Sequence, residues 1–311
     1  MRLFNRNNLK EQYSPVALFV WNRIEHPMQT ISALAKNSEA KYTDLYIFSD
    51  GAKYINEDKI ISELRNKLKS VQGFKSVKLF ERKTNYGLAI NLIDGISRVL
   101  EDHESVIVLE DDILVNTNFL SFMNQCLQKY KNNKKIFTVQ ATTGDPSAIP
   151  DVITRLQPNC HGWAIWKDRW ELFERNVTTA FLDLNKDDML LRKKLNNNNS
   201  INISWQIDAN LRQQRNTWAV YLNYTSVKYE KLNIYPRYQL VKNIGQDGSG
   251  IHKVTAKTDD MNEKWQTKSF FLPDTPPFQD INKPENVDVL NYNEELKKDL
   301  NTDKYTKLIT R

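Results

Sequence analysis

The sequence predicts an α/β protein with a mostly parallel, Rossmann-like central sheet flanked by helices. Short apolar runs alternate along the first half of the chain with segments that have helical spacing, the order expected of strands joined by helical crossovers. One of these runs, Val106 to Leu109, has four consecutive apolar residues. Such a run is typical of a strand buried on both faces, as strands of parallel sheets are.

The expected elements follow in order along the chain. We expect strands at 15–21, 45–49, 77–80, 106–109 and 136–140. Helical spacing covers 27–38, 57–70, 87–101 and 117–131, and in the third of these segments apolar residues recur at intervals of four. This order predicts right-handed crossovers, which bring the carboxyl ends of the parallel strands to one edge of the sheet, where ligands bind.

The chain is expected to divide into a polar leader at 1–14, one domain at 15–252 and a polar C-terminal extension at 253–311. Within the domain, the strand-and-helix alternation of 15–143 gives way to a second half, 144–252, of different character.

The composition describes a globular chain of 311 residues with 40% hydrophobic and 11% aromatic content, which argues against global disorder. The formal net charge of +6 favours anionic partners such as nucleotides or an acidic membrane face. Cys126 and Cys160 are not in a metal-spaced cluster, so we expect ordinary thiols. No run is long enough to span a membrane, and we expect a cytoplasmic protein with at most peripheral contact to the membrane face.

Three adjacent acids, Glu110, Asp111 and Asp112, follow the most apolar of the expected strands. Adjacent carboxylates repel one another unless a cation joins them, so a divalent metal at this strand end is one interpretation. The other is that the acids open a solvated loop before the next helix. The spacing alone does not decide between the two.

Polar residues also follow other expected strands. Arg23 comes after the first strand and Asp50 after the second, while Asn85 and Gly87 form a turn before the helix at 87–101. If these ends face one crevice, they suit nucleotide recognition, with backbone N–H groups available at the helix N-terminus. Gly87 can equally be a simple turn glycine.

The second half offers three further candidates. Trp163 and Trp166 can stack on a sugar or base, although core packing explains most tryptophans. Asp208 shares a helix face with Trp205, which suits either a base tuned by partial burial or a surface acid. The glycine-rich segment 243–252, with Ser249 and His252, suits a lid over phosphates.

Seven segments in order resemble the GT-A glycosyltransferases, in particular bacterial sugar transferases similar to N-acetylglucosaminyltransferase I. The segments are LFVWNR at 18–23, IFSDG at 47–51, NYGL at 85–88, VLEDDI at 108–113, GWAIWKDRW at 162–170, SWQID at 204–208 and LVKNIGQDGSGIH at 240–252. The resemblance covers about residues 15–252 and implies a GT-A fold, with nucleotide-sugar binding in 15–143 and acceptor binding and catalysis in 144–252.

The resemblance also implies roles for particular residues. Asp112 would bind Mn²⁺ or Mg²⁺ at the diphosphate of a nucleotide sugar, with UDP-sugars favoured, and Asp208 would be the base of an inverting transfer. The remaining expected donor contacts are Arg23, Asp50, Asn85, Glu110, Asp111, Trp163, Ser249 and His252.

The assignment of the base is the least direct match. Family members commonly have an acid adjacent to another acid or to tryptophan, whereas two residues separate Trp205 from Asp208, and Asp183, Asp187 and Asp188 are substitutes. The implied acceptor is a glycan or lipid-linked hydroxyl in bacterial surface polysaccharide or lipopolysaccharide synthesis, and no nucleic acid is expected. Two alternatives are a sugar nucleotidyltransferase, disfavoured because 15–30 has no glycine, and a non-catalytic carbohydrate-binding protein, which leaves the three acids unexplained.

Overall fold

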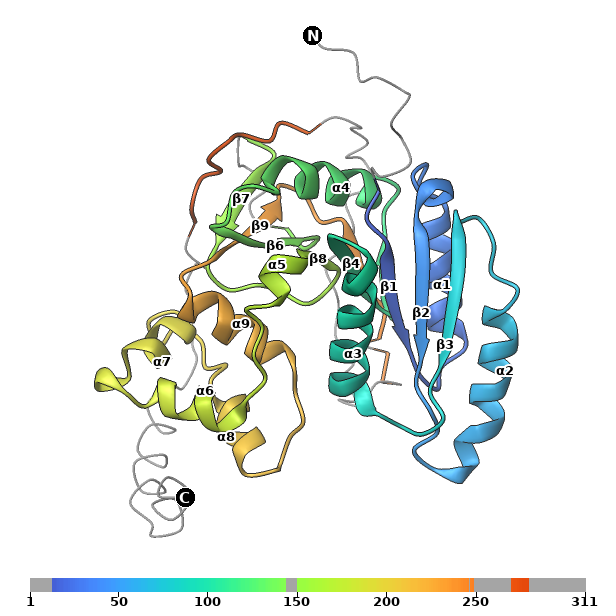
Figure 1. Cartoon of the computed structure of the whole chain (residues 1–311), viewed down its shortest axis with the longest axis horizontal. Coiled ribbons are helices and arrows are strands. Elements are labelled where there is room, and N and C mark those ends of the chain that lie inside the picture. The colour runs from blue at the N-terminus through green and yellow to red at the C-terminus, as the bar shows by residue number, and fades with distance from the viewer. Residues whose placement is uncertain (1–12, 144–149, 246, 249–269, 280–311) are drawn as a thin grey trace.

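The structure, a computed structural model, describes residues 13–143, 150–245, 247–248 and 270–279. It confirms the predicted α/β class: one eight-stranded sheet runs through the molecule, with helices on both faces (Figure 1). Most of the expected leader at 1–14 and of the expected extension at 253–311 lies outside the described residues.

The sheet has the strand order β3-β2-β1-β4-β8-β6-β9-β7. Its strands are β1 (Val16–Val20), β2 (Asp44–Ser49), β3 (Ser76–Glu81), β4 (Ser105–Glu110), β6 (Ile136–Gln140), β7 (Val152–Arg155), β8 (Trp163–Trp166) and β9 (Leu232–Pro236). The first four are parallel to one another, β8 runs antiparallel to both β4 and β6, and β9 is parallel to β6 and antiparallel to β7. A second, two-stranded sheet pairs β5 (Ile113–Val115) with β10 (Val241–Asn243).

The helices cover both faces of the sheet. They are α1 (Glu25–Ala35), α2 (Asp58–Leu68), α3 (Gly87–Asp102), α4 (Phe119–Tyr130), α5 (Lys167–Trp170), α6 (Val177–Leu184), α7 (Leu190–Leu195), α8 (Trp205–Leu211) and α9 (Ala219–Lys228). In the part of the chain that the structure describes, no helix combines the length and apolar character needed to cross a membrane.

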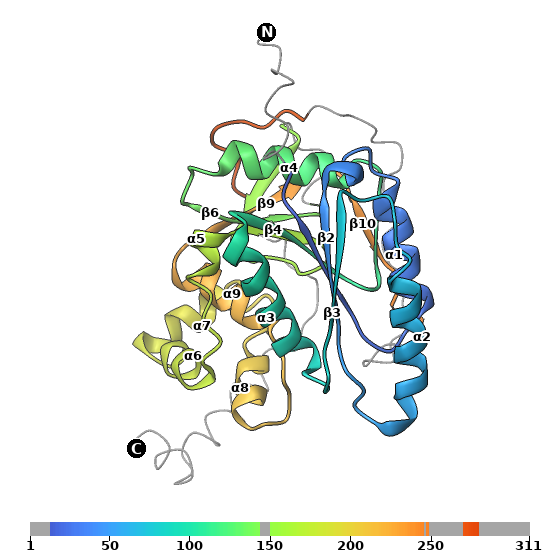
Figure 2. The ribbon, with the colours of Figure 1, turned by 45° about the vertical axis from the view of Figure 1, so that its right-hand side comes forward.

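Strand β1 shows why the sheet is covered on both sides. All five of its residues are buried, and alternate side chains enter different clusters because they point to opposite faces. Val16, Leu18 and Val20 pack with residues of α1, α2 and α4, whereas Ala17 and Phe19 pack with residues of α3. Figure 2 shows α3 on the side of the sheet opposite α1 and α2.

The expected elements of the first half are confirmed, with bounds that differ by a few residues at most. Five strands and four helices lie where alternation and helical spacing predict them. Strands β7, β8 and β9 have no counterpart among the expected elements, and β8 is the segment whose tryptophans suggested ligand stacking. Cys126 and Cys160 are free thiols, as expected.

The second half adds a helical cluster and completes the sheet. Helices α6 to α9 share a separate apolar cluster that includes Phe181, Leu195 and Tyr221. Part of the expected extension also packs against the domain: Phe270 is 8% exposed and contacts Phe122 of α4, and Thr154 of β7 donates to the carbonyl of Pro277.

Candidate functional site

The winding of the sheet changes direction between β1 and β4. Successive strands move outward from β1 to β2 and β3, and the chain then returns to place β4 on the other side of β1. In open α/β sheets the crevice at such a switch point, outside the carboxyl ends of the strands, is where ligands bind. Arg23 follows β1, Glu110 ends β4, and Asp111 and Asp112 come directly after it, so both groups lie at this switch point.

Arg23 joins two of the three acids. Its Nη2 lies 2.5 Å from Oδ1 of Asp111 and 3.0 Å from Oδ2 of Asp112. Burial lowers the pKa of Arg23, but the two carboxylates outweigh burial and raise it. The Nη1 atom of Arg23 is buried and has no hydrogen-bond partner among the described residues. The Arg23 guanidinium therefore joins Asp111 and Asp112, while its Nη1 makes no hydrogen bond to the described residues.

Among the described residues, the three acids outnumber the single guanidinium beside them, which leaves an excess of carboxyl groups at this strand end. Burial, with a contribution from Asp112 and Asp111, raises the pKa of Glu110 to about 8. Burial also raises the pKa of Asp111 to about 6, although Arg23 opposes this rise. A second cation at this strand end would favour the charged form of both carboxyl groups.

The donor set fits a divalent metal that takes few protein ligands. No group of three or more histidine, cysteine, aspartate or glutamate side chains that could hold a metal occurs within the described ranges. Mg²⁺ sites for phosphorylated substrates commonly use one or two carboxylates and leave the other positions to phosphate oxygens and water. Asp111 and Asp112 can supply one or two such carboxylates. We therefore expect a metal ion here together with a phosphorylated substrate that completes its coordination.

The segment after β10 lies directly against Asp112. The backbone N–H of Ile244 donates to the Asp112 carbonyl at 2.9 Å. A Cβ atom on Gly245 would lie 2.0 Å from Oδ2 of Asp112, so only glycine permits this approach. Farther along, Asp247 pairs with His26 of α1 at 3.2 Å. The first part of the expected lid therefore contacts the acids, while Ser249 and His252 lie outside the described residues.

Asp50 organises the turn before α3. Its carboxylate accepts hydrogen bonds from the backbone N–H groups of Gly51, Tyr86 and Gly87, at 2.8–2.9 Å, and from Nδ2 of Asn85 at 3.2 Å. Only 3% of Asp50 is exposed. Both carboxylate oxygens thus accept hydrogen bonds from the protein itself. Asp50 and Asn85, which were both expected to contact the nucleotide sugar, are bonded to each other in one turn.

Trp163 lies in the core instead of at a binding surface. It is 1% exposed and stacks on Trp218, with ring centroids 5.7 Å apart. Trp166 is 2% exposed, and its ring N–H donates to the Leu127 carbonyl. Both rings belong to apolar core clusters on the faces of the sheet, so neither has an exposed face for a sugar or base.

Asp208 is held in a buried ion pair. Its two carboxylate oxygens accept hydrogen bonds from the guanidinium of Arg192 at 2.8 and 3.0 Å, and Arg192 also donates to Oγ of Ser204. The side chains of Arg192 and Asp208 are 5% and 2% exposed. A carboxylate so engaged is not free to accept a proton, which argues against the expected role of Asp208 as base in this conformation.

The substitute acids are placed differently. Asp183 accepts hydrogen bonds from Lys186, Lys228 and Tyr224, and burial, which raises its pKa, is outweighed by these bonds, so the pKa falls to about 2. Asp187 and Asp188 are exposed in a short helical turn between α6 and α7.

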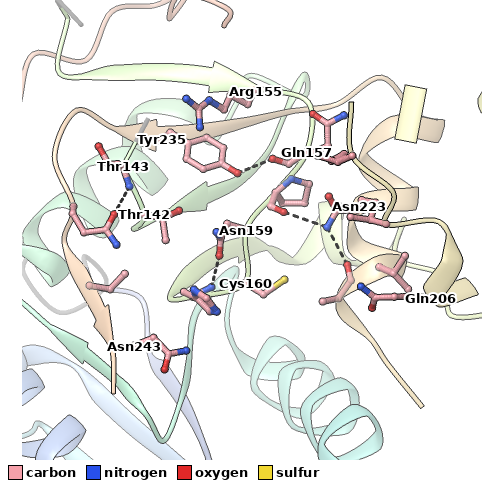
Figure 3. A pocket seen from close by; sticks show the side chains of 18 residues that line it. Thr142, Thr143, Arg155, Gln157, Asn159, Cys160, Gln206, Asn223, Tyr235 and Asn243 are labelled. Carbon is pink, nitrogen blue, oxygen red and sulfur yellow. Dashed lines mark hydrogen bonds between the residues drawn. The ribbon is translucent and has the colours of Figure 1, made fainter. Parts of the chain in front are cut away.

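A cavity of about 690 Å³, shown with its lining side chains in Figure 3, was not anticipated from the sequence. Its walls come from the segments 142–143, 155–161, 201–206, 219–223 and 235–243. Asn243 lines the cavity one residue before Ile244, which contacts Asp112. Cys160 lines it as well; burial raises the pKa of this thiol, and the nearby charge of Glu110 adds to the rise. The cavity is built from five separate segments, so no local pattern marks it.

Three solved structures match parts of this chain at low identity. TarS from S. aureus is 14% identical with a TM-score of 0.31, and the match covers 43% of this chain and 22% of that one. Mannosyltransferase PcManGT from Pyrobaculum calidifontis, solved with GDP-Man and Mn²⁺, is 13% identical with a TM-score of 0.35, covering 53% and 47%. Glucosyl-3-phosphoglycerate synthase from Mycobacterium tuberculosis, solved with Mn²⁺, UDP and glucosyl-3-phosphoglycerate, is 10% identical with a TM-score of 0.32, covering 53% and 60%.

The chain therefore spans less than two thirds of the length of each of these three proteins. No protein-family model and no curated protein matches the chain.

Proposed function

We propose that this chain is a metal-dependent GT-A glycosyltransferase that moves a sugar from a nucleotide-sugar donor to a hydroxyl of a glycan or lipid-linked acceptor. The observation that carries the proposal is the cluster of Arg23, Asp111 and Asp112 at the crevice between β1 and β4, with Gly245 packed against it. The ordered motifs in the sequence support the same function.

The donor would lie with its diphosphate at the acid cluster. A divalent ion bound there supplies charge that stabilises the departing diphosphate. Asp112 would hold the ion, and Asp111 and Glu110 would orient the donor. The buried Nη1 of Arg23, which has no hydrogen-bond partner in the described part of the chain, is a donor suited to a phosphate oxygen or ribose hydroxyl. The turn that Asp50 fixes would form the wall against which the nucleotide packs.

The transfer would be a single displacement. The acceptor hydroxyl oxygen attacks the anomeric carbon, the bond from that carbon to the diphosphate oxygen breaks, and the hydroxyl proton passes to a base. One displacement without an enzymic nucleophile inverts the configuration at the carbon. Asp208 can accept that proton only after Arg192 releases its carboxylate.

The finer features of the proposal follow the motif resemblance. They are a UDP-linked hexose or N-acetylhexosamine, a relation to enzymes similar to N-acetylglucosaminyltransferase I, and a place in bacterial surface polysaccharide or lipopolysaccharide synthesis. The net charge of +6 suits a cytoplasmic enzyme that contacts an anionic membrane face.

Thermal unfolding with UDP, GDP or CDP, each with and without Mn²⁺, tests the proposal. A ligand present at 100 times its Kd stabilises a protein by about 2.7 kcal/mol. At about 2–4 °C per kcal/mol for a domain of this size, UDP with Mn²⁺ should raise Tm by roughly 5–11 °C.

Asp112→Asn should lose the Mn²⁺-dependent part of this shift and the sugar transfer. Asp102→Asn makes the same change at an exposed residue before β4, at the opposite end of that strand, and should behave like wild type. The proposal is wrong if no nucleotide stabilises the protein, or if Asp112→Asn responds to UDP with Mn²⁺ and transfers sugar as wild type does.

A further inference from the structure

The walls of the 690 Å³ cavity are rich in carboxamides and contain no carboxylate among the described residues that line it. Six of the lining side chains are amides: Gln157, Asn159, Gln206, Asn223, Gln239 and Asn243. Arg155 is the one arginine or lysine in this lining. A wall of this kind can bind a hydroxyl-rich ligand without repelling an anion.

Three of these amides are oriented by the protein backbone. The side-chain oxygen of Asn159 accepts from the His161 N–H at 2.9 Å, and that of Gln239 accepts from the Thr143 N–H at 2.6 Å, as Figure 3 shows. Asn243 accepts in the same way from the Gly245 N–H at 2.8 Å. Because each oxygen is engaged by backbone, the NH₂ group of each of these three amides is the end that remains for a ligand.

Two other amides of the wall have the opposite orientation. The NH₂ group of Gln157 donates to the Lys194 carbonyl, and that of Asn223 donates to the carbonyls of Pro158 and Ala219, so their side-chain oxygens are the ends that remain.

Arg155 adds a positive charge to these donors. Its guanidinium lies over the ring of Tyr235, 5.2 Å from the centroid (Figure 3). Its Nη2 donates to the side-chain oxygen of Gln279 at 3.0 Å. The Tyr235 hydroxyl in turn donates to the Gln157 carbonyl, which fixes the ring beneath the guanidinium. Stacking and hydrogen bonding thus hold the arginine at the wall of the cavity.

We propose that this cavity is the acceptor subsite and that it takes a sugar bearing an anionic group, a carboxylate or a phosphate. The designation as acceptor subsite rests on the proposed glycosyltransferase function, whereas the selectivity for an anionic sugar follows from the wall itself. In the described wall, the positively charged Arg155 and three amide NH₂ groups exceed the two amide oxygens that remain as acceptors, so donors are in excess of what the hydroxyl protons of a neutral sugar require. An anionic oxygen only accepts, and hydrogen bonds to charged groups are the stronger ones.

Direct binding of three monosaccharides tests this proposal without any transfer reaction. D-Glucuronate, D-glucose 6-phosphate and D-glucose are titrated into the full chain and followed by ligand-observed NMR. We expect at least one anionic sugar to bind about ten-fold or more tightly than glucose. The tighter of the two anionic sugars identifies the group, carboxylate or phosphate, that the cavity accepts.

Gln239→Glu provides the sharpest variant. The glutamate keeps an oxygen for the Thr143 N–H and replaces the NH₂ group with negative charge, so the anionic sugar should bind about ten-fold more weakly, with glucose unchanged. Gln128→Glu makes the same change on the exposed side of α4 and should leave all three affinities unchanged. Arg155→Gln should also weaken binding of the anionic sugar, as Gln239→Glu does.

Two results would overturn the proposal. One is equal binding of glucose and both anionic sugars. The other is a Gln239→Glu variant that retains full affinity for the anionic sugar but loses stabilisation by UDP with Mn²⁺, because the cavity would then hold the donor. If wild type binds the anionic sugar but UDP with Mn²⁺ does not stabilise it, the proposed transferase function fails while the anionic-sugar site stands.

Discussion

Replacing Asp208 by asparagine separates its structural role from the expected catalytic one. In the structure its carboxylate is the partner of the Arg192 guanidinium, with side chains 2% and 5% exposed. Asparagine keeps the size of the side chain but leaves the arginine charge buried and uncompensated. Breaking a buried ion pair in this way costs about 3–5 kcal/mol. At about 2–4 °C per kcal/mol, Tm should fall by roughly 6–20 °C.

Thermal and urea unfolding of four proteins provides the assay: wild type, Asp208→Asn, Arg192→Met, and the double variant Arg192→Met with Asp208→Leu. The double variant removes both charges and should recover most of the stability, since an apolar pair of similar volume is often as stable as the buried ion pair. Nucleotide binding by folded Asp208→Asn should stay near that of wild type. An Asp208→Asn protein that melts within about 2 °C of wild type yet loses transfer would refute this reasoning and support the base assignment.

Two further predictions concern the strand ends. Glu110 has a folded-state pKa of about 8, against an ordinary value of 4.5, so the folded protein retains a proton that the unfolded chain has lost. In EDTA, the free energy of unfolding should therefore fall as pH rises from 6 to 8, a range that lies above the pKa of Asp111. Urea titrations should show a smaller pH dependence for Glu110→Gln, and equal pH dependence in the two proteins would contradict the prediction. A Cβ on Gly51 would lie 2.4 Å from the Thr84 carbonyl carbon, so Gly51→Ala should destabilise the protein by about 1–3 kcal/mol; unchanged urea unfolding would contradict this.

The first half of the fold could be predicted because its signals are local. The run Val106 to Leu109 is β4, and helical spacing locates α3, since burial on one face repeats along a few turns of helix. The second half gave weaker signals. Strand β8 has only four residues, and its tryptophans indicate core packing and ligand stacking equally well until the neighbouring strands are known.

The candidate site was predicted in part. Arg23 meets Asp111 and Asp112, as the places of these residues after β1 and β4 predict, because parallel strands end at a common edge. The use of Asp50 by the turn at 85–87 could not be predicted, since that turn lies 35 residues or more away along the chain. The expected Ser249 and His252 contacts stay predictions.

The sequence by itself determined that the chain has a parallel α/β core and that three acids end one of its buried strands. Both features are local, because each depends on the types of neighbouring residues in the chain. Tertiary structure alone decided which polar groups are engaged across the chain: Asp208 with Arg192, Asp50 with the turn at 85–87, and Gln239 of the cavity with the distant backbone of Thr143. The physical reason is that hydrogen-bond partners and burial depend on the packing of segments far apart in the chain, which no local pattern encodes.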